Sequence, residues 1–203
     1  MADESVTCGA VLWRHRGRQV LTVVVKASFS FAHGGPMLPG APPPIARADR
    51  TFEQQPGRSL ELASDLAPYL ARCDVLFRGY VYAQKGQAAP AGAARLAVFR
   101  DARPLLDKTI HVFAQPGGSL RAMRSVAASN AEQLFSRMPI VYERAFGGPD
   151  VEANPVGVET PNLVDPAGPG RPVGFGPIAP HWPARRRLFG VRRPDPDALP
   201  DDL

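Results

Sequence analysis

Turn-forming residues recur every few positions in the last third of the chain, and they limit what this segment can fold into. They include Asn154-Pro155, Pro161-Asn162, Pro169-Gly170 and Gly174-Phe175-Gly176-Pro177. Proline lacks a backbone donor and glycine weakens regular elements, so a long helix or strand is excluded here. Apolar residues are interleaved with the turns, namely Val156, Leu163, Phe175, Ile178 and Trp182. We predict an irregular but ordered segment over residues 149–193, packed on the domain through these side chains, and a frayed tail over 194–203.

The same two residue types are frequent elsewhere, with 23 prolines and 19 glycines among 203 residues. This frequency favours short strands and long loops over helices. A chain of this length can bury one substantial core. The fold class predicted is therefore mainly β: a single antiparallel sheet or sandwich-like domain over residues 1–193, with long ordered Pro/Gly-rich loops and little helix.

The clearest strand signal is an alternation of side chains over residues 20–31. One face of this strand carries Leu21, Val23, Val25, Ala27, Phe29 and Phe31. The other face carries Val20, Thr22, Val24, Lys26, Ser28 and Ser30, and it becomes polar towards its end. A period of two predicts a strand whose first face is fully buried and whose second face is partly covered. Lys26 is expected to extend from the partly covered face towards water.

Two further regions show strand patterns. Residues 73–83 alternate, with Cys73 on the apolar side, where a buried structural cysteine is expected. Residues 95–100 and 105–113 flank Asp101-Ala102-Arg103-Pro104. Two apolar runs separated by four residues that favour turns predict a β-hairpin.

Residues 138–148 form the densest group of informative residues and read Met-Pro-Ile-Val-Tyr-Glu-Arg-Ala-Phe-Gly-Gly. Glu143 and Arg144 need either solvent or partners, because an unpaired buried charge is costly. Gly147-Gly148 permits a sharp turn. We expect Glu143 and Arg144 to tie the irregular segment to the sheet, with the two glycines as the corner.

The sequence also contains one set of residues that would suit acid–base chemistry. Asp65, Asp74 and Glu143, together with Arg144, are candidates for a hydrolase-like site. Turn caps or ion pairs with arginine explain the three carboxylates more simply. The sequence shows no familiar catalytic or dinucleotide motif, and its four histidines lack metal-ligand spacing. We therefore expect no enzymatic activity, no cofactor and no metal, and keep the hydrolase as an alternative.

The net charge of +5 raises the question of a polyanionic partner. Most arginines are scattered, and the block Arg185-Arg186-Arg187 is soon followed by aspartates. Nucleic-acid or polyanion binding through residues 185–193 is therefore an alternative with less support. The acidic start does not resemble a signal peptide, and no apolar run reaches the roughly 18 residues of a membrane helix. The expected location is the cytoplasm, without membrane contact.

Several short motifs, taken in order, resemble those of one bacterial protein family. They are Val24-Val25-Lys26-Ala27-Ser28-Phe29, Ser64-Asp65-Leu66-Ala67-Pro68, Cys73-Asp74-Val75, residues 138–148, Asn154-Pro155-Val156-Gly157, Pro161-Asn162-Leu163, Gly174-Phe175-Gly176-Pro177 and Trp182-Pro183-Ala184-Arg185. Together they resemble the domain-of-unknown-function proteins encoded beside type VI secretion spike genes, which act as effector adaptors or chaperones. The resemblance covers most of the chain.

The resemblance implies a non-enzymatic chaperone that binds a toxic effector and helps to load it onto the VgrG/PAAR spike. It implies no catalytic residue. The family-motif residues, expected to be structural, are Lys26, Asp65, Asp74, Pro139, Tyr142, Glu143, Arg144, Gly147, Gly148, Asn154, Pro155, Gly157, Gly174, Phe175, Gly176, Trp182 and Arg185.

The chain departs from the family pattern at three places. Phe113-Ala114-Gln115-Pro116 stands where a Gly-Asp-Arg followed by tryptophan is usual, and Leu70 stands where lysine is usual. Family members also tend to continue beyond the Trp-x-x-Arg motif. We therefore expect a short or truncated member that folds but either binds its partner differently or is inactive.

Overall fold

The computed structural model describes residues 6–15, 17–66, 73–117, 134–168 and 170–188. The chain is mainly β with several antiparallel sheets, which confirms the predicted fold class. The described strands form four separate sheets rather than one. No helix among the described residues is long and apolar enough to cross a membrane.

The chain divides into two compact units. Unit 1 comprises Met1–Arg50, Leu62–Cys73 and Leu188–Leu203, and unit 2 comprises Thr51–Glu61 and Asp74–Arg187. Each unit is described by itself, and the single domain over 1–193 stays a prediction. The tail predicted over 194–203 lies outside the described residues.

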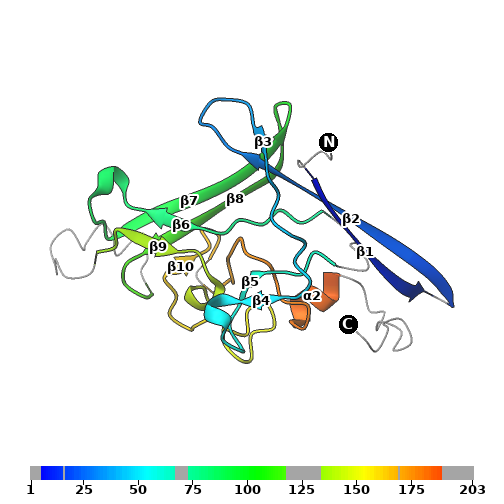
Figure 1. Ribbon diagram of the computed structural model, residues 1–203. Helices are drawn as coiled ribbons and strands as arrows, with labels where there is room; N and C mark the ends of the chain where they lie inside the picture. Colours follow the sequence, from blue (N-terminus) through cyan, green and yellow to red (C-terminus); the bar gives the residue numbers. More distant parts are fainter. Residues whose placement is uncertain (1–5, 16, 67–72, 118–133, 169, 189–203) are drawn as a thin grey trace. The chain divides into compact units, whose positions relative to one another are not determined.

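Unit 1 is built on a long antiparallel hairpin of β1 (Val6–His15) and β2 (Arg18–Ser30), drawn in blue in Figure 1. The register runs from Val6 opposite Ala27 to His15 opposite Arg18. Gly17, in the turn, has a φ of +75°, a conformation that side chains disfavour. A short third strand, β3 (Leu38–Gly40), pairs with the last three residues of β2.

The prediction about which face of β2 is buried was wrong. Leu21, Val23 and Val25 are 61–63% exposed, whereas Val24 on the opposite face is half-buried. The opposite face is the covered one: the side chains of Ile45 and Leu66 lie against Gly9 of β1 on that side. Alternation reveals two faces but does not say which one turns inward, and β2 carries valines on both.

Unit 2 contains the predicted hairpin, formed by β7 (Ala91–Arg100) and β8 (Arg103–Phe113). The connection is Asp101-Ala102, two residues instead of four, and Asp101 adopts a φ of +54°. A short strand, β10 (Leu163–Val164), pairs with β8 and gives the sheet order β10-β8-β7.

The remaining elements are short. They are β4 (Arg50–Thr51) paired with β5 (Leu60–Leu62), β6 (Tyr80–Tyr82) paired with β9 (Arg137–Pro139), the 3-10 helices η1 (Phe52–Gln54), η2 (Gln84–Gly86) and η3 (Tyr142–Arg144), and α2 (Pro183–Leu188).

The strand predicted over residues 73–83 is shorter than expected. Only β6 is a strand, and Cys73, which was expected to be buried, is exposed. Phe77 instead contacts the irregular segment: its N–H donates to the Phe175 carbonyl at 2.8 Å, and the two rings meet edge to face. The irregular segment is therefore held at Phe175 by the loop that contains Phe77.

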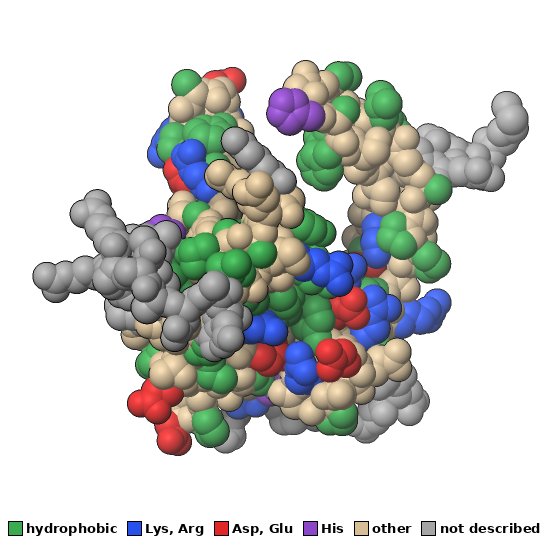
Figure 2. Space-filling model, turned by 90° about the vertical axis from the view of Figure 1, so that its left-hand side faces the viewer, with side chains coloured by type: hydrophobic (Ala, Val, Ile, Leu, Met, Phe, Trp, Pro, Cys, Tyr) green, Lys and Arg blue, Asp and Glu red, His purple; other side chains and the backbone are tan. Residues whose placement is uncertain are grey.

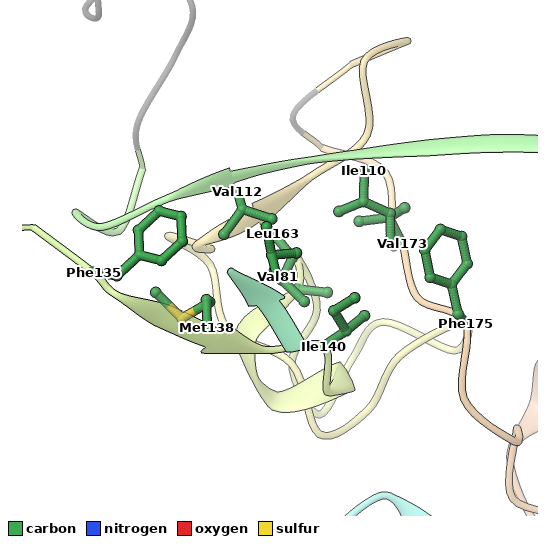
Figure 3. Packing of buried hydrophobic residues seen from close by; sticks show 10 residues of the cluster. Val81, Ile110, Val112, Phe135, Met138, Ile140, Leu163, Val173 and Phe175 are labelled. Atoms are coloured by element: carbon green, nitrogen blue, oxygen red, sulfur yellow. The ribbon is translucent and has the colours of Figure 1, made fainter. Parts of the chain in front are cut away.

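The core of unit 2 lies between the β7–β8 sheet and the β6–β9 pair (Figure 3). Its members are Val81, Ile110, Val112, Phe135, Met138, Ile140, Ala145, Leu163, Val173 and Phe175. Three of them belong to residues 149–193, and in that region Trp182 is also buried. Each large apolar side chain buried in this way contributes about 1.5–3 kcal/mol. Of the five anchors expected in the irregular segment, Leu163, Phe175 and Trp182 are buried, whereas Val156 and Ile178 are half-buried.

Candidate functional site

Residues 138–148 run beside the irregular segment for several residues. Ala145 and Phe146 form bridges with Leu163 and Val158. The Arg144 carbonyl accepts the Asn162 N–H at 2.9 Å, and the Arg144 guanidinium approaches the Asn162 side-chain oxygen at 3.5 Å. Arg144 thus contacts the irregular segment through both its carbonyl and its guanidinium.

The Glu143 carboxylate, in contrast, binds residues 58–59 and none of the described residues of the irregular segment, so that expectation was wrong. Its Oε1 accepts the Ser59 N–H at 2.7 Å and the Arg58 Nε–H at 3.0 Å, and its Oε2 accepts the Ser59 hydroxyl at 2.7 Å. Burial alone would raise the pKa of Glu143, but these hydrogen bonds outweigh it and hold that pKa below its usual value. Because the Glu143 carboxylate accepts three hydrogen bonds from Arg58 and Ser59, it fixes the position of the loop at residues 58–59.

Asn154 holds the corner that follows. Its buried Nδ2 donates to the carbonyls of Tyr142 at 2.9 Å and Phe146 at 3.0 Å. A Cβ at Gly147 would lie 2.2 Å from the Asn154 carbonyl oxygen, and one at Gly157 would lie 2.3 Å from Asn154 Nδ2. Glycine is required at both positions because any side chain would collide with Asn154.

The corner itself is at Gly148. This residue has a φ of +148°, and its N–H donates to the Asn154 carbonyl at 3.0 Å. The prediction of a corner at the glycine doublet is confirmed. Pro155, the next motif residue, is half-buried.

Tyr142 joins the other end of the irregular segment. Its hydroxyl donates to the Gly176 carbonyl at 3.0 Å, and its ring lies on Gly174, where a Cβ would be 2.5 Å from the ring. The ring also meets Trp182 edge to face, at 5.3 Å between centroids. Burial raises the pKa of Tyr142 to about 12, although the positive charge of Arg185 opposes this. Tyr142 is therefore a neutral packing and hydrogen-bonding residue.

Two motif residues form an ion pair in unit 1. Lys26 Nζ lies 2.7 Å from Asp65 Oδ2 and 3.3 Å from the Pro44 carbonyl, so it does not simply extend into water as expected. Asp65 also accepts the Ala46 N–H at 2.7 Å. Burial alone would raise the pKa of Asp65, but the hydrogen bonds from Lys26 and Ala46 hold it below its usual value.

The carboxylates of the hydrolase alternative are engaged separately. Asp74 forms an ion pair with Arg185 at 2.5 Å, Glu143 pairs with Arg58, and Asp65 pairs with Lys26. Each carboxylate thus has its own cationic partner, and none of the three partners is Arg144. These contacts link the three carboxylates to three different parts of the chain.

Two of the three described arginines of the basic alternative form ion pairs with acidic residues. Arg185 binds Asp74 and Arg187 binds Glu152, while residues 189–193 lie outside the described residues. On the face in view in Figure 2, Lys and Arg side chains lie next to Asp and Glu side chains. Within the described ranges, no group of three or more His, Cys, Asp or Glu residues could hold a metal ion.

The exposed face of the β1–β2 hairpin is the strongest candidate binding site. We call it the outer face, and it comprises Val6, Cys8, Ala10, Leu12 and Arg14 of β1 with Gln19, Leu21, Val23, Val25, Ala27 and Phe29 of β2. Cross-strand partners share a face, so these side chains form one continuous strip. A contiguous exposed apolar strip on a sheet is typical of a protein-interaction site.

Sequence reasoning placed half of this face on the wrong side and missed the other half. The β1 strand was not predicted, although Val6, Cys8, Ala10 and Leu12 alternate with other residues ahead of Gly17. Two alternating runs on either side of a short connection that contains a glycine are a hairpin signal. That signal identifies the hairpin but not the orientation of its faces.

No curated protein and no solved structure has significant similarity to the chain. The sequence profile of the family described as "Uncharacterized protein conserved in bacteria (DUF2169)" matches residues 16–201. The matched range includes β2, residues 138–148 and the irregular segment. The chain therefore belongs to the DUF2169 family of uncharacterized bacterial proteins.

Proposed function

We propose that the protein is a non-enzymatic accessory of type VI secretion. It binds a toxic effector in the cytoplasm and helps to load it onto the VgrG/PAAR spike. The order and content of the motifs, from Val24-Val25-Lys26 to Trp182-Pro183-Ala184-Arg185, support the connection with secretion. Membership of a bacterial family that spans residues 16–201 is compatible with it.

The outer face is the observation that carries the binding role. Leu12, Leu21, Val23 and Val25 are each more than half exposed, side by side on two paired strands. Leaving such side chains in water forgoes about 1.5–3 kcal/mol each, which burial against a partner recovers. The motif residues around 138–148, in contrast, are occupied by contacts within unit 2. Binding through the hairpin and stabilisation through residues 138–148 are thus separate tasks.

Co-expression tests this proposal directly. The tagged chain would be produced together with the toxin and the VgrG/PAAR protein encoded by neighbouring genes, and each would be followed through affinity and size-exclusion chromatography. The proposal predicts a stable complex with the toxin, the spike protein or both. If the chain elutes separately from the toxin and from the spike protein, the proposal is refuted.

The control separates partner binding from adhesion of exposed apolar residues in general. Leu105 of β8 is 55% exposed and lies on the other hairpin. Leu105→Thr is expected to leave the complex intact, whereas Val23→Thr combined with Val25→Thr is expected to disrupt it. Threonine is β-branched, like the two valines that it replaces, and β-branched residues suit exposed strand positions such as Leu105, so both variants are expected to fold.

A further inference from the structure

The outer face has the dimensions of one α-helix. From Arg14 to Val6 it covers alternate residues of β1, a length of about 27 Å at about 3.4 Å per residue. Its two strands lie about 4.8 Å apart, which makes the strip about 10 Å wide. An α-helix with its side chains is about 10 Å in diameter and rises 1.5 Å per residue. A helix of about 18 residues therefore matches the strip in both dimensions.

The sizes of the side chains on the outer face also suit an α-helix. In the middle of the strip β1 carries Cys8 and Ala10, whereas β2 carries Val25 and Val23 opposite them. Small side chains on one strand allow close approach, and the valines offer apolar contact beside it. An amphipathic helix has a single apolar stripe of the corresponding width.

The area of the face argues against a second copy of this chain as the occupant. A strip of about 27 by 10 Å covers roughly 300 Å². Stable pairs of globular proteins bury about 800 Å² on each partner. Two outer faces stacked on each other would remain well short of that, whereas an amphipathic helix contacts its partner through one apolar stripe of the same shape as this strip.

The charge on the outer face indicates which way round a helix would bind along the hairpin. Arg14 lies on the outer face at the turn end of the hairpin, opposite Gln19. Arg14 is the one charged residue among the described residues of the outer face, which include no aspartate and no glutamate. A partner with acidic residues at the end nearest the turn is favoured by this arrangement.

We infer that the outer face binds one amphipathic α-helix of about 18 residues from a partner protein, with its apolar stripe along β1 and β2 and its acidic end at Arg14. The inference rests on the proposed function in one respect, because that function supplies the class of partner. The geometry of recognition is independent of which secreted protein carries the helix.

Synthetic peptides test the inference with the full chain. The probe is a fluorescein-labelled 18-residue peptide with a leucine stripe at helical spacing and two glutamates at one end. The comparator has the same composition in an order that breaks the stripe. Fluorescence anisotropy is expected to show saturable binding of the probe, and about tenfold or weaker binding of the comparator. Equal behaviour of the two peptides overturns the inference.

Variants of the face locate the binding and set its direction. Val23→Thr with Val25→Thr is expected to raise the probe Kd about tenfold, and Leu105→Thr is expected to leave it unchanged. Arg14→Glu is expected to weaken the binding of the probe with glutamates at its end and to strengthen the binding of a peptide with lysines there. Arg18→Glu, at the same turn but on the opposite face, is the matched control. An equal effect of the two arginine variants contradicts the assigned direction.

Cysteine labelling gives a second readout. Cys8 lies on the outer face and Cys73 lies elsewhere in the chain, and both are exposed. Bound probe is expected to slow maleimide labelling of Cys8 and to leave that of Cys73 unchanged. Unchanged labelling of Cys8 at saturating probe overturns the placement.

Three outcomes separate this inference from the function on which it rests. Secreted partners that bind the wild type and the Val23→Thr/Val25→Thr variant equally would overturn the helix site but leave the adaptor function standing. Probe binding without any complex with toxin or spike protein would refute the adaptor function and support the site. A wild-type dimer that the same double substitution converts to a monomer would assign the face to a second copy and overturn the inference.

Discussion

Glu143→Ala is expected to destabilise unit 2 strongly. The carboxylate accepts hydrogen bonds from the N–H and the hydroxyl of Ser59, and Ser59 is completely buried. Each buried donor left without an acceptor costs about 1–3 kcal/mol. The expected loss is therefore about 3 kcal/mol in the free energy of unfolding. Arg58, the third donor, adds little because it keeps Glu53 as a partner.

Urea unfolding followed through Trp182 measures this loss. Trp182 is 1% exposed and contacts Tyr142, so its fluorescence reports on the neighbourhood of Glu143. Trp13→Phe in every protein removes the other tryptophan signal. With a slope of about 2 kcal/mol per molar urea, the midpoint is expected to fall by about 1.5 M.

Glu53→Ala is the matched control for this experiment. Glu53 binds the same Arg58 at 3.0 Å, but its side chain is 64% exposed. Exposed ion pairs contribute about 0–1 kcal/mol, so the midpoint is expected to move by less than about 0.5 M. A Glu143→Ala midpoint no lower than that of Glu53→Ala would refute the assignment of Glu143 as the residue that holds Ser59.

Three further changes follow from the same contacts. Hydrogen bonds hold the pKa of Glu143 below 4.5, so its stabilising contribution is complete at neutral pH and is lost as pH falls through the folded-state pKa. The stability gap between wild type and Glu143→Gln, measured by urea unfolding, is therefore expected to shrink as the pH is lowered below 4.5. Gly157→Ala is expected to cost about 3 kcal/mol, since its Cβ would meet Asn154, whereas Gly168→Ala, with no atom closer than 3.9 Å, is expected to stay within about 0.5 kcal/mol in the same assay. Asp65→Ala removes the acceptor of the Ala46 N–H and is expected to lower the stability of unit 1 by about 2 kcal/mol, followed through Trp13 fluorescence; an unchanged midpoint would contradict the role given to this carboxylate.

Local patterns predicted the local structure well. The alternation of residues 95–113 specified a hairpin, and the density of proline and glycine after Gly148 specified an irregular segment. Gly147-Gly148 specified a corner, and the structure shows the close approach of Asn154 that makes glycine necessary there. In each case the physical cause acts within a few residues along the chain.

Contacts between residues far apart in the chain could not be predicted from the sequence. Glu143 had several possible partners, and its selection of Ser59, 84 positions away, depends on how the loop at 58–59 folds back. The inward face of β2 was equally undetermined, because both faces carry valines. What decides it is the cover provided by Ile45 and Leu66, which come from later parts of the chain. A pattern of alternation contains no information about that cover.

The most direct test of the account is the affinity of the secreted partner for the outer-face variant. Isothermal titration of the toxin or spike protein would compare the wild type, Val23→Thr with Val25→Thr, and Leu105→Thr, after urea unfolding has shown equal stability of all three. The account predicts that the double substitution raises Kd about tenfold or more and that Leu105→Thr has no effect. An unchanged Kd in the double variant would contradict the claim that this protein binds its partner through the β1–β2 hairpin.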